Sequence, residues 1–243
     1  MDKNEMKHIE LIDKVLPIQP DFELKTVRLF NIDCMLFMKE IPDNYYELAI
    51  VDPPYGIGFG KFNRTNKDSS GKTYKANKYK NSNWDNAIPD ERYFKELMRV
   101  SQNQIIWGGN YFPVLWGYGG KCFLFWHKAN PVPNFSDGEL AWTSFNKVAR
   151  QIDLRYYGNL EGKTSASKKY HPTQKPIQLY KWLFTNYAKK GDKIFDSHGG
   201  SFSSACACLD MGFEFDGCEI DKEYFNNAVN RLKNNVQDYF EFT

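Results

Sequence analysis

Short apolar strands alternate with helical segments along most of the chain, and this alternation restricts the possible folds more than any other feature of the sequence. Apolar runs bounded by turn residues predict strands at 26–33, 48–51, 103–109, 121–128, 139–145, 152–157, 192–196 and 213–221. Apolar residues at helical spacing predict helices at 34–43, 90–101, 176–190, 199–212 and 221–234. Strands that alternate with helices are typical of an α/β domain with a mostly parallel, doubly wound sheet.

The bulk composition limits the number of domains and the class of protein. A chain of 243 residues with 42% apolar residues accommodates one domain of ordinary size, and we assign 1–243 to it. The five cysteines form no CxxC pair and only four histidines are present, so we expect free thiols and no metal site. The charged N-terminus and the absence of a long apolar stretch predict a cytoplasmic protein without a membrane segment.

The strand at 48–51 runs directly into the motif Asp52-Pro53-Pro54-Tyr55. An exocyclic amine of a nucleobase is a poor nucleophile because its lone pair is delocalised into the ring, so a catalyst must supply acceptors for the amine protons. Asp52 offers a carboxylate, and the Pro53 carbonyl offers a second acceptor in a backbone stiffened by two prolines. Tyr55 offers a flat face on which an extruded base can stack. The alternative is a strand-end turn with an incidental tyrosine.

Two further strand ends carry residues typical of nucleotide-binding α/β folds. The strand at 192–196 is followed by Ser197-His198-Gly199-Gly200-Ser201, where glycines let the backbone approach a ligand closely. Another strand leads into Cys218-Glu219-Ile220-Asp221, where an acid can accept both hydroxyls of a ribose. A plain tight turn is the alternative. The segment His171-Pro172-Thr173-Gln174-Lys175-Pro176 indicates, by itself, only a rigid helix entry.

Together these motifs resemble the amino-methyltransferase family of DNA enzymes, which act on adenine N6 or cytosine N4, and the resemblance covers most of residues 25–235. It implies a Rossmann-like methyltransferase fold with S-adenosylmethionine as cofactor. The catalytic motif precedes the cofactor loop, which is the circularly permuted order of the beta class. The catalytic residues that it implies are Asp52, Pro53, Pro54 and Tyr55. The cofactor-binding residues that it implies are Asp33, Cys34, Asp52, His171, Thr173, Lys175, Asp196, His198, Gly200, Ser201, Ser203, Glu219 and Ile220.

The resemblance also assigns particular roles within the cofactor site. Asp33 matches the acid that contacts the cofactor's adenine, and the segment 171–176 is similar to one that helps to hold the methionine part. The chain departs from the family at Phe202, where a second glycine is usual. A ring there could crowd the cofactor, forbid a positive φ angle, or point into the core. A DNA-binding homologue with impaired catalysis is therefore one alternative.

Residues 60–83 form a polar segment that lacks apolar periodicity, and its only acid is Asp68. The resemblance implies double-stranded DNA as the partner, so we expect this segment to contact phosphates, with a solvated flexible loop as the alternative. The basic residues that we expect to bind DNA are Lys61, Arg64, Lys67, Lys72, Lys75, Lys78 and Lys80.

Relatives in this family often place a target-recognition region just before the segment at 171–176. Only about residues 146–170 are available for it here, and we assign them to target recognition. A second subunit could compensate for so small a region, so a homodimer is expected, and a restriction endonuclease is a further expected partner. We expect methylation of adenine N6, with cytosine N4 as the alternative because its chemistry is similar.

Overall fold

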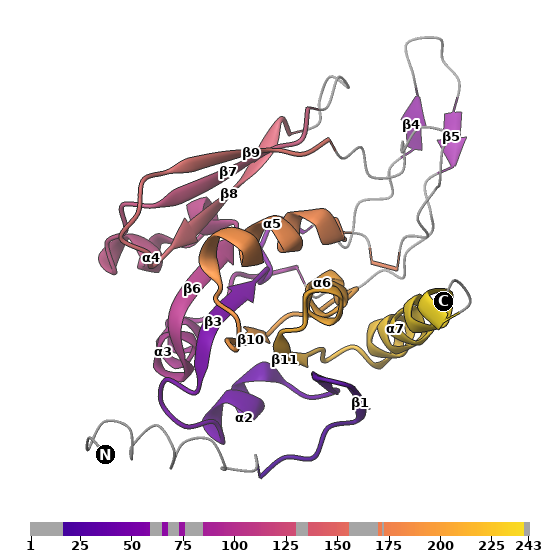
Figure 1. The fold of residues 1–243 in the computed structure, drawn as a ribbon. Helices are drawn as coiled ribbons and strands as arrows, with labels where there is room; N and C mark the ends of the chain where they lie inside the picture. The colour runs from indigo at the N-terminus through magenta and orange to yellow at the C-terminus, as the bar shows by residue number, and fades with distance from the viewer. Residues whose placement is uncertain are drawn as a thin grey trace, which may run out of the picture.

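The computed structural model describes residues 17–58, 65–67, 73–75, 85–129, 136–155, 170–171 and 173–240, and the side chains at 65–67, 73–75 and 235–240 are outside this description. A nine-stranded sheet in the order β1-β2-β11-β10-β3-β6-β8-β7-β9 forms the centre of the fold (Figure 1). Its strands are β1 (Phe22–Leu24), β2 (Val27–Phe30), β3 (Tyr46–Val51), β6 (Ser101–Trp107), β7 (Phe123–His127), β8 (Gly138–Thr143), β9 (Arg150–Asp153), β10 (Lys193–Asp196) and β11 (Glu214–Cys218).

Most neighbouring strands run parallel, as the alternation of strands and helices predicts. The run β2-β11-β10-β3-β6 is parallel throughout, and β7 is parallel to β9. Antiparallel pairs join β1 to β2, β6 to β8 and β7 to β8. The antiparallel strand β8 therefore lies between β6 and β7 on one side of the parallel core.

Helices cover both faces of the sheet. They are α2 (Cys34–Lys39), α3 (Glu91–Val100), α4 (Pro113–Gly117), α5 (Ile177–Tyr187), α6 (Ser203–Met211) and α7 (Lys222–Phe240), with a 3-10 turn η2 at Gly109–Tyr111. Helices α2, α3 and α4 contribute to one apolar core, and α5, α6 and α7 contribute to a second. Two cores on opposite faces of one sheet are the arrangement of a doubly wound α/β domain, so the predicted fold class is confirmed.

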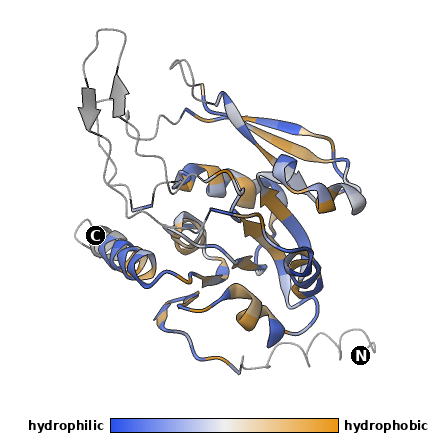
Figure 2. Ribbon diagram, turned by 180° about the vertical axis from the view of Figure 1, so that it is seen from behind, coloured by the Kyte–Doolittle hydropathy of each residue, from blue (hydrophilic) through white to orange (hydrophobic). Residues whose placement is uncertain are grey.

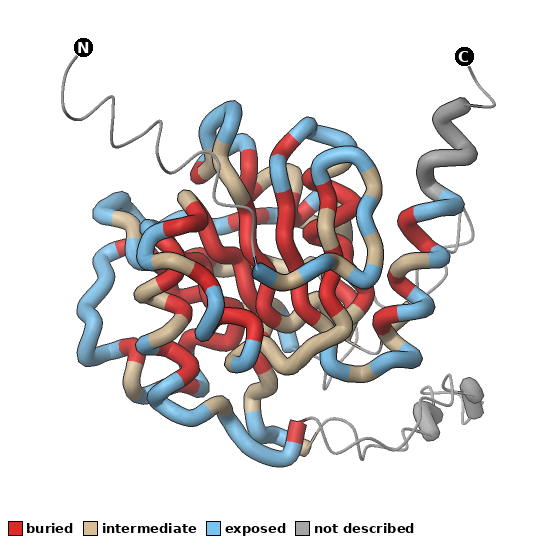
Figure 3. Tube along the Cα trace, turned by 90° about the horizontal axis from the view of Figure 1, so that it is seen from below, coloured by how far each residue is buried: buried red, intermediate tan, exposed pale blue. Residues whose placement is uncertain are grey.

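The alternation of side chains along β3 shows why the sheet supports two cores. Leu48 and Ile50 pack into the core with α5, α6 and α7, while Ala49 and Val51 pack into the core with α2 and α3. A strand buried on both faces needs such a continuous apolar run, because successive side chains point to opposite faces. The buried strands lie at the centre of Figure 3, and in Figure 2 the ribbon of α3 is mostly hydrophilic while the neighbouring strands carry hydrophobic residues.

The structure contains elements that the sequence did not predict, among them the edge strand β1. The polar segment 60–83, predicted to be an irregular loop, contains an antiparallel pair of strands, β4 (Thr65–Lys67) and β5 (Thr73–Lys75). The short helix α4 was not predicted at all. A polar hairpin has no apolar alternation to reveal it, and a helix of five residues is too short to show a helical period.

The carboxyl ends of the parallel strands meet at one edge of the sheet. Asp52 follows β3, Asp196 ends β10, and Glu219 follows β11. The helices that come next after β10 and β3, α6 and α3, pack on opposite faces, which opens a crevice at these strand ends. Among the described residues no helix is both long and apolar enough to cross a membrane.

Candidate active site

The turn after β3 places Asp52 at the mouth of the crevice and is held by a residue that the motif does not contain. The buried carboxylate of Asp85 accepts hydrogen bonds from the backbone N–H groups of Tyr55 (2.8 Å) and Gly56 (2.9 Å). Gly56 has a φ angle of 71°, which favours glycine. Because the two prolines cannot donate backbone hydrogen bonds, Asp85 supplies the anchoring that fixes the turn.

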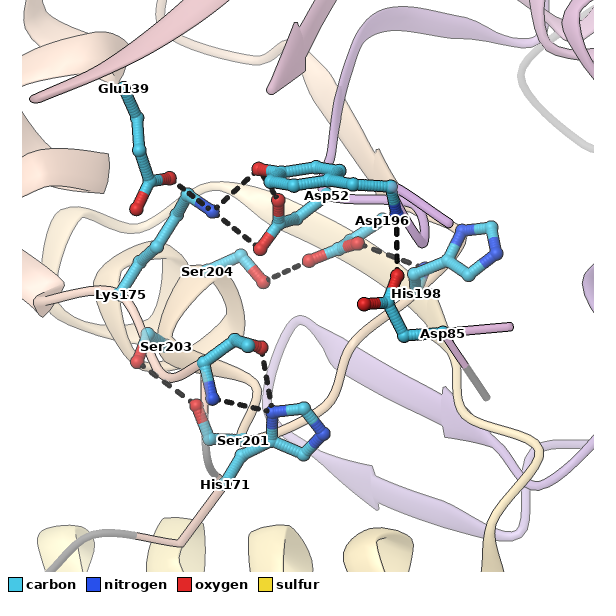
Figure 4. A network of polar contacts seen from close by, with 12 residues as sticks. Asp52, Asp85, Glu139, His171, Lys175, Asp196, His198, Ser201, Ser203 and Ser204 are labelled. Atoms are coloured by element: carbon cyan, nitrogen blue, oxygen red, sulfur yellow. Dashed lines mark hydrogen bonds and ion pairs between the residues drawn. The ribbon is translucent and has the colours of Figure 1, made fainter. Parts of the chain in front are cut away.

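The Asp52 carboxylate lies within a chain of alternating charges (Figure 4). Its Oδ1 accepts a hydrogen bond from the Tyr55 hydroxyl at 2.6 Å, and its Oδ2 lies 2.5 Å from Nζ of Lys175. Nζ of Lys175 also lies 3.0 Å from Oε2 of Glu139, and Lys128 pairs with the other oxygen of Glu139. Carboxylates and ammonium groups that are removed from water persist only when they are paired in this way.

The titration of this network reflects both burial and pairing. Burial raises the pKa of Asp52 above its ordinary value, and the charge of Lys175 limits the rise. Burial also opposes ionisation of Glu139, but Lys175 and Lys128 outweigh it and lower its pKa to about 2. Burial acts against the charge of Lys175, yet the two carboxylates raise its pKa. Lys175 and Glu139 are therefore ionised at neutral pH.

The ring of Tyr55 is packed between defined neighbours. It stacks on Tyr111 with ring centroids 4.9 Å apart and an angle of 13° between the planes. It also packs closely on Gly108, where an added Cβ would lie 2.2 Å from the ring. Tyr111 is 40% exposed, so the stacked pair presents aromatic surface beside Asp52. Flat aromatic surface of this kind can stack on an extruded base.

The loop after β10 begins with a buried carboxyl group. Asp196 accepts a hydrogen bond from the Ser204 hydroxyl at 2.6 Å and another from the His198 N–H at 3.1 Å. Burial raises the pKa of Asp196 to about 7, although both hydrogen bonds oppose the rise. Burial lowers the pKa of His198 to about 4, so its imidazole is neutral at neutral pH. Nδ1 of this ring lies 2.8 Å from the Ser197 hydroxyl.

The acid after β11 is tied to the same loop. Oε2 of Glu219 accepts a hydrogen bond from the Gly200 N–H at 2.8 Å, and Oε1 accepts one from the Asp221 N–H. Gly200 has a φ angle of 53°, which a glycine adopts without strain. Asp33 lies at the start of α2 and accepts hydrogen bonds from the N–H groups of the first turn. Glu219 thus fixes the glycine loop while it lies at the strand tip expected for a ribose-binding acid.

A pocket of about 370 Å³ opens between these strand ends. Three predicted site residues line it, namely Cys34, Pro54 and His198. The others that line it are Met35, Ala87, Ile88, Pro89, Asp90, Arg92 and Tyr93. A mostly apolar slot with a few polar groups at its rim suits a flat heterocycle.

Phe202 does not obstruct the loop. Its side chain is fully buried in the core and packs near Phe215. Residue 202 adopts a φ angle of 49° and a ψ angle of 44°, which lie in the left-handed region. The phenylalanine therefore does not forbid a positive φ angle at this position. An added Cβ at Gly199 or Gly217 would lie 2.0 Å or 2.4 Å from this ring, so both glycines make room for it. Of the three alternatives for Phe202, the structure shows a ring that points into the core.

The predicted residues Ser201 and Ser203 are held by a side chain that the sequence did not indicate. The buried guanidinium of Arg231, on α7, donates to the Ser201 carbonyl at 2.9 Å and to the Ser203 hydroxyl at 3.0 Å. The hydroxyls of the two serines lie 3.4 Å apart. The structure therefore places both serines against α7 rather than on the wall of the pocket.

The segment at 171–176 lies against the glycine loop at 197–201 and against the turn after β3. The His171 ring packs on Tyr224 with centroids 4.4 Å apart and accepts a hydrogen bond from the Thr173 N–H at 3.3 Å. A Cβ added at Gly200 would lie 3.4 Å from this ring. Lys175, which the resemblance assigns to the cofactor site, has its Nζ between Asp52 and Glu139.

Several predicted residues are exposed or lie outside the described part of the chain. Ile220 is 67% exposed. Lys67 and Lys75 end β4 and β5, where only the backbone is described. The remaining residues expected to bind DNA lie outside the described residues, namely Lys61, Arg64, Lys72, Lys78 and Lys80. Within the described residues no group of His, Cys, Asp and Glu is arranged to hold a metal ion.

Four residues that shape the site were not predicted from the sequence: Asp85, Tyr111, Glu139 and Arg231. Glu139 begins the predicted strand at 139–145, and Tyr111 follows the predicted strand at 103–109. The resemblance implies that these two strands flank the catalytic pocket, which is a usable signal. Asp85 and Arg231 lie far in sequence from the motifs that they hold. Their roles depend on long-range contacts that no local pattern indicates.

Comparison with known proteins identifies a family and several relatives. A family model described as DNA methylase, of the N6/N4 type, matches residues 106–230, which is just over half of the chain. The Type II methyltransferase M2.DpnII of Streptococcus pneumoniae is 25% identical over 273 residues, covering 96% of this chain and 98% of that protein.

Two solved structures share the fold. The M1.HpyAVI–SAM complex aligns with a TM-score of 0.56 at 21% identity, over 84% of this chain and 99% of that chain. The PvuII DNA methyltransferase, titled cytosine-N4-specific, aligns with a TM-score of 0.58 at 13% identity, over 90% and 94% of the two chains. These matches confirm the methyltransferase fold, while the circular permutation stays a prediction.

Proposed function

The chain belongs to the N6/N4 family of DNA methylases, and we propose that it transfers a methyl group from S-adenosylmethionine to N6 of adenine in double-stranded DNA. The observation that carries this proposal is the position of Asp52. Asp52 directly follows the central strand β3, beside β10 and its glycine loop, with stacked aromatic rings at its side. This position supports the proposal because an acceptor for amine protons would lie between a surface for a base and a site for a nucleotide cofactor.

The residues at the strand ends fit the cofactor. The pocket beside Cys34, Pro54 and His198 would hold the adenine, and Glu219 at the tip of β11 would accept the ribose hydroxyls. S-adenosylmethionine, when bound, supplies an electrophilic methyl group on a sulfonium. His198 is neutral at neutral pH, so it places no positive charge beside the pocket.

The catalytic turn would orient the target amine. Both oxygens of Asp52 already accept one hydrogen bond or ion pair, from Tyr55 and from Lys175. A carboxylate has about four lone-pair directions, so Asp52 can still accept a proton of the amine. With the Pro53 carbonyl accepting a hydrogen bond from the second N–H group, the nitrogen lone pair would turn toward the methyl group. The nearby anion would stabilise the positive charge that develops on the nitrogen as the new nitrogen–carbon bond replaces the carbon–sulfur bond. Asp52 would then accept the proton from the nitrogen and release it to solvent.

Methylation of cytosine N4 is the second candidate function. The same acceptors would orient that amine, and the PvuII enzyme that shares this fold is titled cytosine-N4-specific. Adenine is favoured because the motif begins with aspartate, which is the tendency of the adenine enzymes that the chain resembles. The third alternative, a homologue with impaired catalysis, loses its motivation because the Phe202 ring is buried away from the loop.

The experiment that tests the function is methyl transfer from labelled S-adenosylmethionine to mixed-sequence duplex DNA, followed by digestion and identification of the modified nucleoside. We expect N6-methyladenine. N4-methylcytosine would keep the mechanism and change the substrate. A folded protein that binds S-adenosylmethionine but transfers no methyl group to any DNA would contradict the proposal.

We further propose that the basic segment 60–83 contacts the DNA backbone, because it follows the catalytic turn in sequence and carries seven basic residues against one acid. Replacing Lys72, Lys75, Lys78 and Lys80 by glutamine should weaken DNA binding and flatten its dependence on salt. Each phosphate contact contributes about 0.9 to the slope of log K against log salt concentration, so the slope should fall by roughly 2 to 4.

Binding of a labelled duplex between about 50 and 200 mM salt measures this slope. A matched variant with four exposed lysines changed outside the segment, Lys39, Lys121, Lys189 and Lys190, controls for net charge. Equal slopes for the two variants would show that the segment is merely solvated.

We also propose that residues 1–243 form a single domain in which 146–170 take part in target recognition. The protein would act in the cytoplasm as a homodimer, with a restriction endonuclease as a further partner.

A further inference from the structure

Lys175 is held by three acceptors at once. Its side chain is only 4% exposed, and its Nζ lies 2.5 Å from Oδ2 of Asp52, 3.0 Å from Oε2 of Glu139 and 3.4 Å from Oη of Tyr55. An ammonium group has three N–H donors and no acceptor. The Tyr55 hydroxyl donates to Asp52, which leaves its oxygen free to accept from the lysine. The donors of Lys175 and the acceptors around it therefore match in number.

The three acceptors come from different parts of the fold. Asp52 and Tyr55 belong to the turn after β3, while Glu139 lies on β8 at the far side of β6. The lysine itself precedes α5, and its Nζ lies near the rings of Trp107 and Tyr55. Figure 4 shows Glu139 and Asp52 approaching the same nitrogen from two sides. Nζ of Lys175 is therefore shared between the two carboxylates and lies closer to Asp52 than to Glu139.

Charge balance explains what this division achieves. The transferred methyl group leaves positive charge on the target nitrogen, and an anionic Asp52 stabilises that charge. A lysine paired with Asp52 alone would cancel much of this effect. A lysine shared with Glu139 holds the carboxylate in place and cancels less of its charge, while Lys128 balances Glu139.

We propose that Glu139 is a positioning residue for methyl transfer, which divides the Lys175 ammonium between two carboxylates and so orients Asp52 without neutralising it. This inference rests on the proposed function. Neither the catalytic motif nor the cofactor motifs include Glu139, and the resemblance places its strand beside the pocket without giving this side chain a role. Glu139 acts through Lys175 and does not touch the substrate.

The charge arrangement predicts opposite effects of two substitutions on pH dependence. The titratable and charged groups that face Asp52 are Tyr55, Glu139, Lys175, Tyr180 and Asp196, with Lys128 behind Glu139. Glu139 raises the pKa of Asp52 and Lys175 lowers it. Because transfer needs ionised Asp52, the rate falls as pH drops through this pKa. Glu139→Gln should therefore shift the acid limb of the pH–rate profile, which is the fall in rate at low pH, to lower pH. Lys175→Met should shift it to higher pH.

The measurement is the single-turnover rate of methyl transfer to mixed-sequence DNA, with enzyme in excess, as a function of pH. We expect the rate at neutral pH to fall about 10-fold for Glu139→Gln and about 100-fold for Lys175→Met, because misplacement of a catalytic group by an ångström costs on the order of 100-fold. Glu23→Gln and Lys190→Met, both at exposed positions, are matched controls and should keep the wild-type profile.

A wild-type rate and an unmoved acid limb in Glu139→Gln would overturn the inference, as would shifts of both variants in the same direction. If Glu139→Gln does not fold, Glu139→Asp replaces it. That variant keeps the negative charge but moves it away from Lys175 by the length of one methylene group. Its rate of methyl transfer should therefore fall while the acid limb of the pH–rate profile stays in place. An undiminished rate would overturn the inference. Absence of transfer by the wild-type protein would instead reject the proposed function itself, so the two failures are distinguishable.

Discussion

Replacing Asp52 by alanine is expected to lower the rate of methyl transfer by on the order of 1,000-fold or more. The substitution removes the acceptor that orients the target amine and the anion that stabilises charge on its nitrogen. Asp52 is not among the residues that line the pocket of about 370 Å³, so affinity for S-adenosylmethionine should stay within about threefold of the wild-type value. Single-turnover transfer and equilibrium binding of the cofactor measure the two effects separately.

The Asp52 variant also needs a control for stability, because it leaves Lys175 with Glu139 as its remaining carboxylate partner. A thermal unfolding curve shows whether the variant is folded at the assay temperature. Asp137→Ala changes an exposed aspartate and should retain wild-type transfer. Undiminished turnover by a folded Asp52→Ala protein would exclude Asp52 from catalysis. A parallel loss of cofactor binding would show that Asp52 serves the cofactor site instead.

The sequence was sufficient to predict the elements that bear the site. Apolar runs located β3, β10 and β11, and the residues after each run proved to lie together because carboxyl ends of parallel strands share one edge of a sheet. Asp52 and Glu219 are predictable in this way, since each follows directly on a strand that its own local pattern reveals. The polar hairpin β4–β5 was not predicted, because nothing in its sequence pattern differs from that of a loop.

The contacts that hold the site could not be predicted from local pattern. Asp85 anchors the catalytic turn from outside the motif, and Arg231 reaches the cofactor loop from the last helix. The resemblance assigns Lys175 to the cofactor site, but it gives no indication that the Nζ of this lysine pairs with Asp52. A local pattern states which residue types are present, but the partner of a buried charge is decided by packing between distant elements.

Replacing Phe202 by alanine is expected to lower the free energy of unfolding by about 3–5 kcal/mol, the usual cost of removing a fully buried phenylalanine ring. The ring fills space that Gly199 and Gly217 leave open, and neither glycine can replace the lost contacts. Denaturant unfolding measures the change. The exposed ring of Tyr118 supplies a comparison, and its replacement by alanine should cost less than about 1 kcal/mol.

Phe202→Gly separates the ring from the backbone conformation. At an ordinary helical position glycine is about 1 kcal/mol less stable than alanine. Residue 202 has a φ angle of 49°, where a side chain costs about 1–2 kcal/mol and glycine costs nothing. The glycine variant should therefore be no less stable than the alanine variant. If the glycine variant were instead less stable than the alanine variant by about 1 kcal/mol, the left-handed conformation would carry no strain. Packing of the ring alone would then explain why this chain has phenylalanine where the family that it resembles usually has glycine.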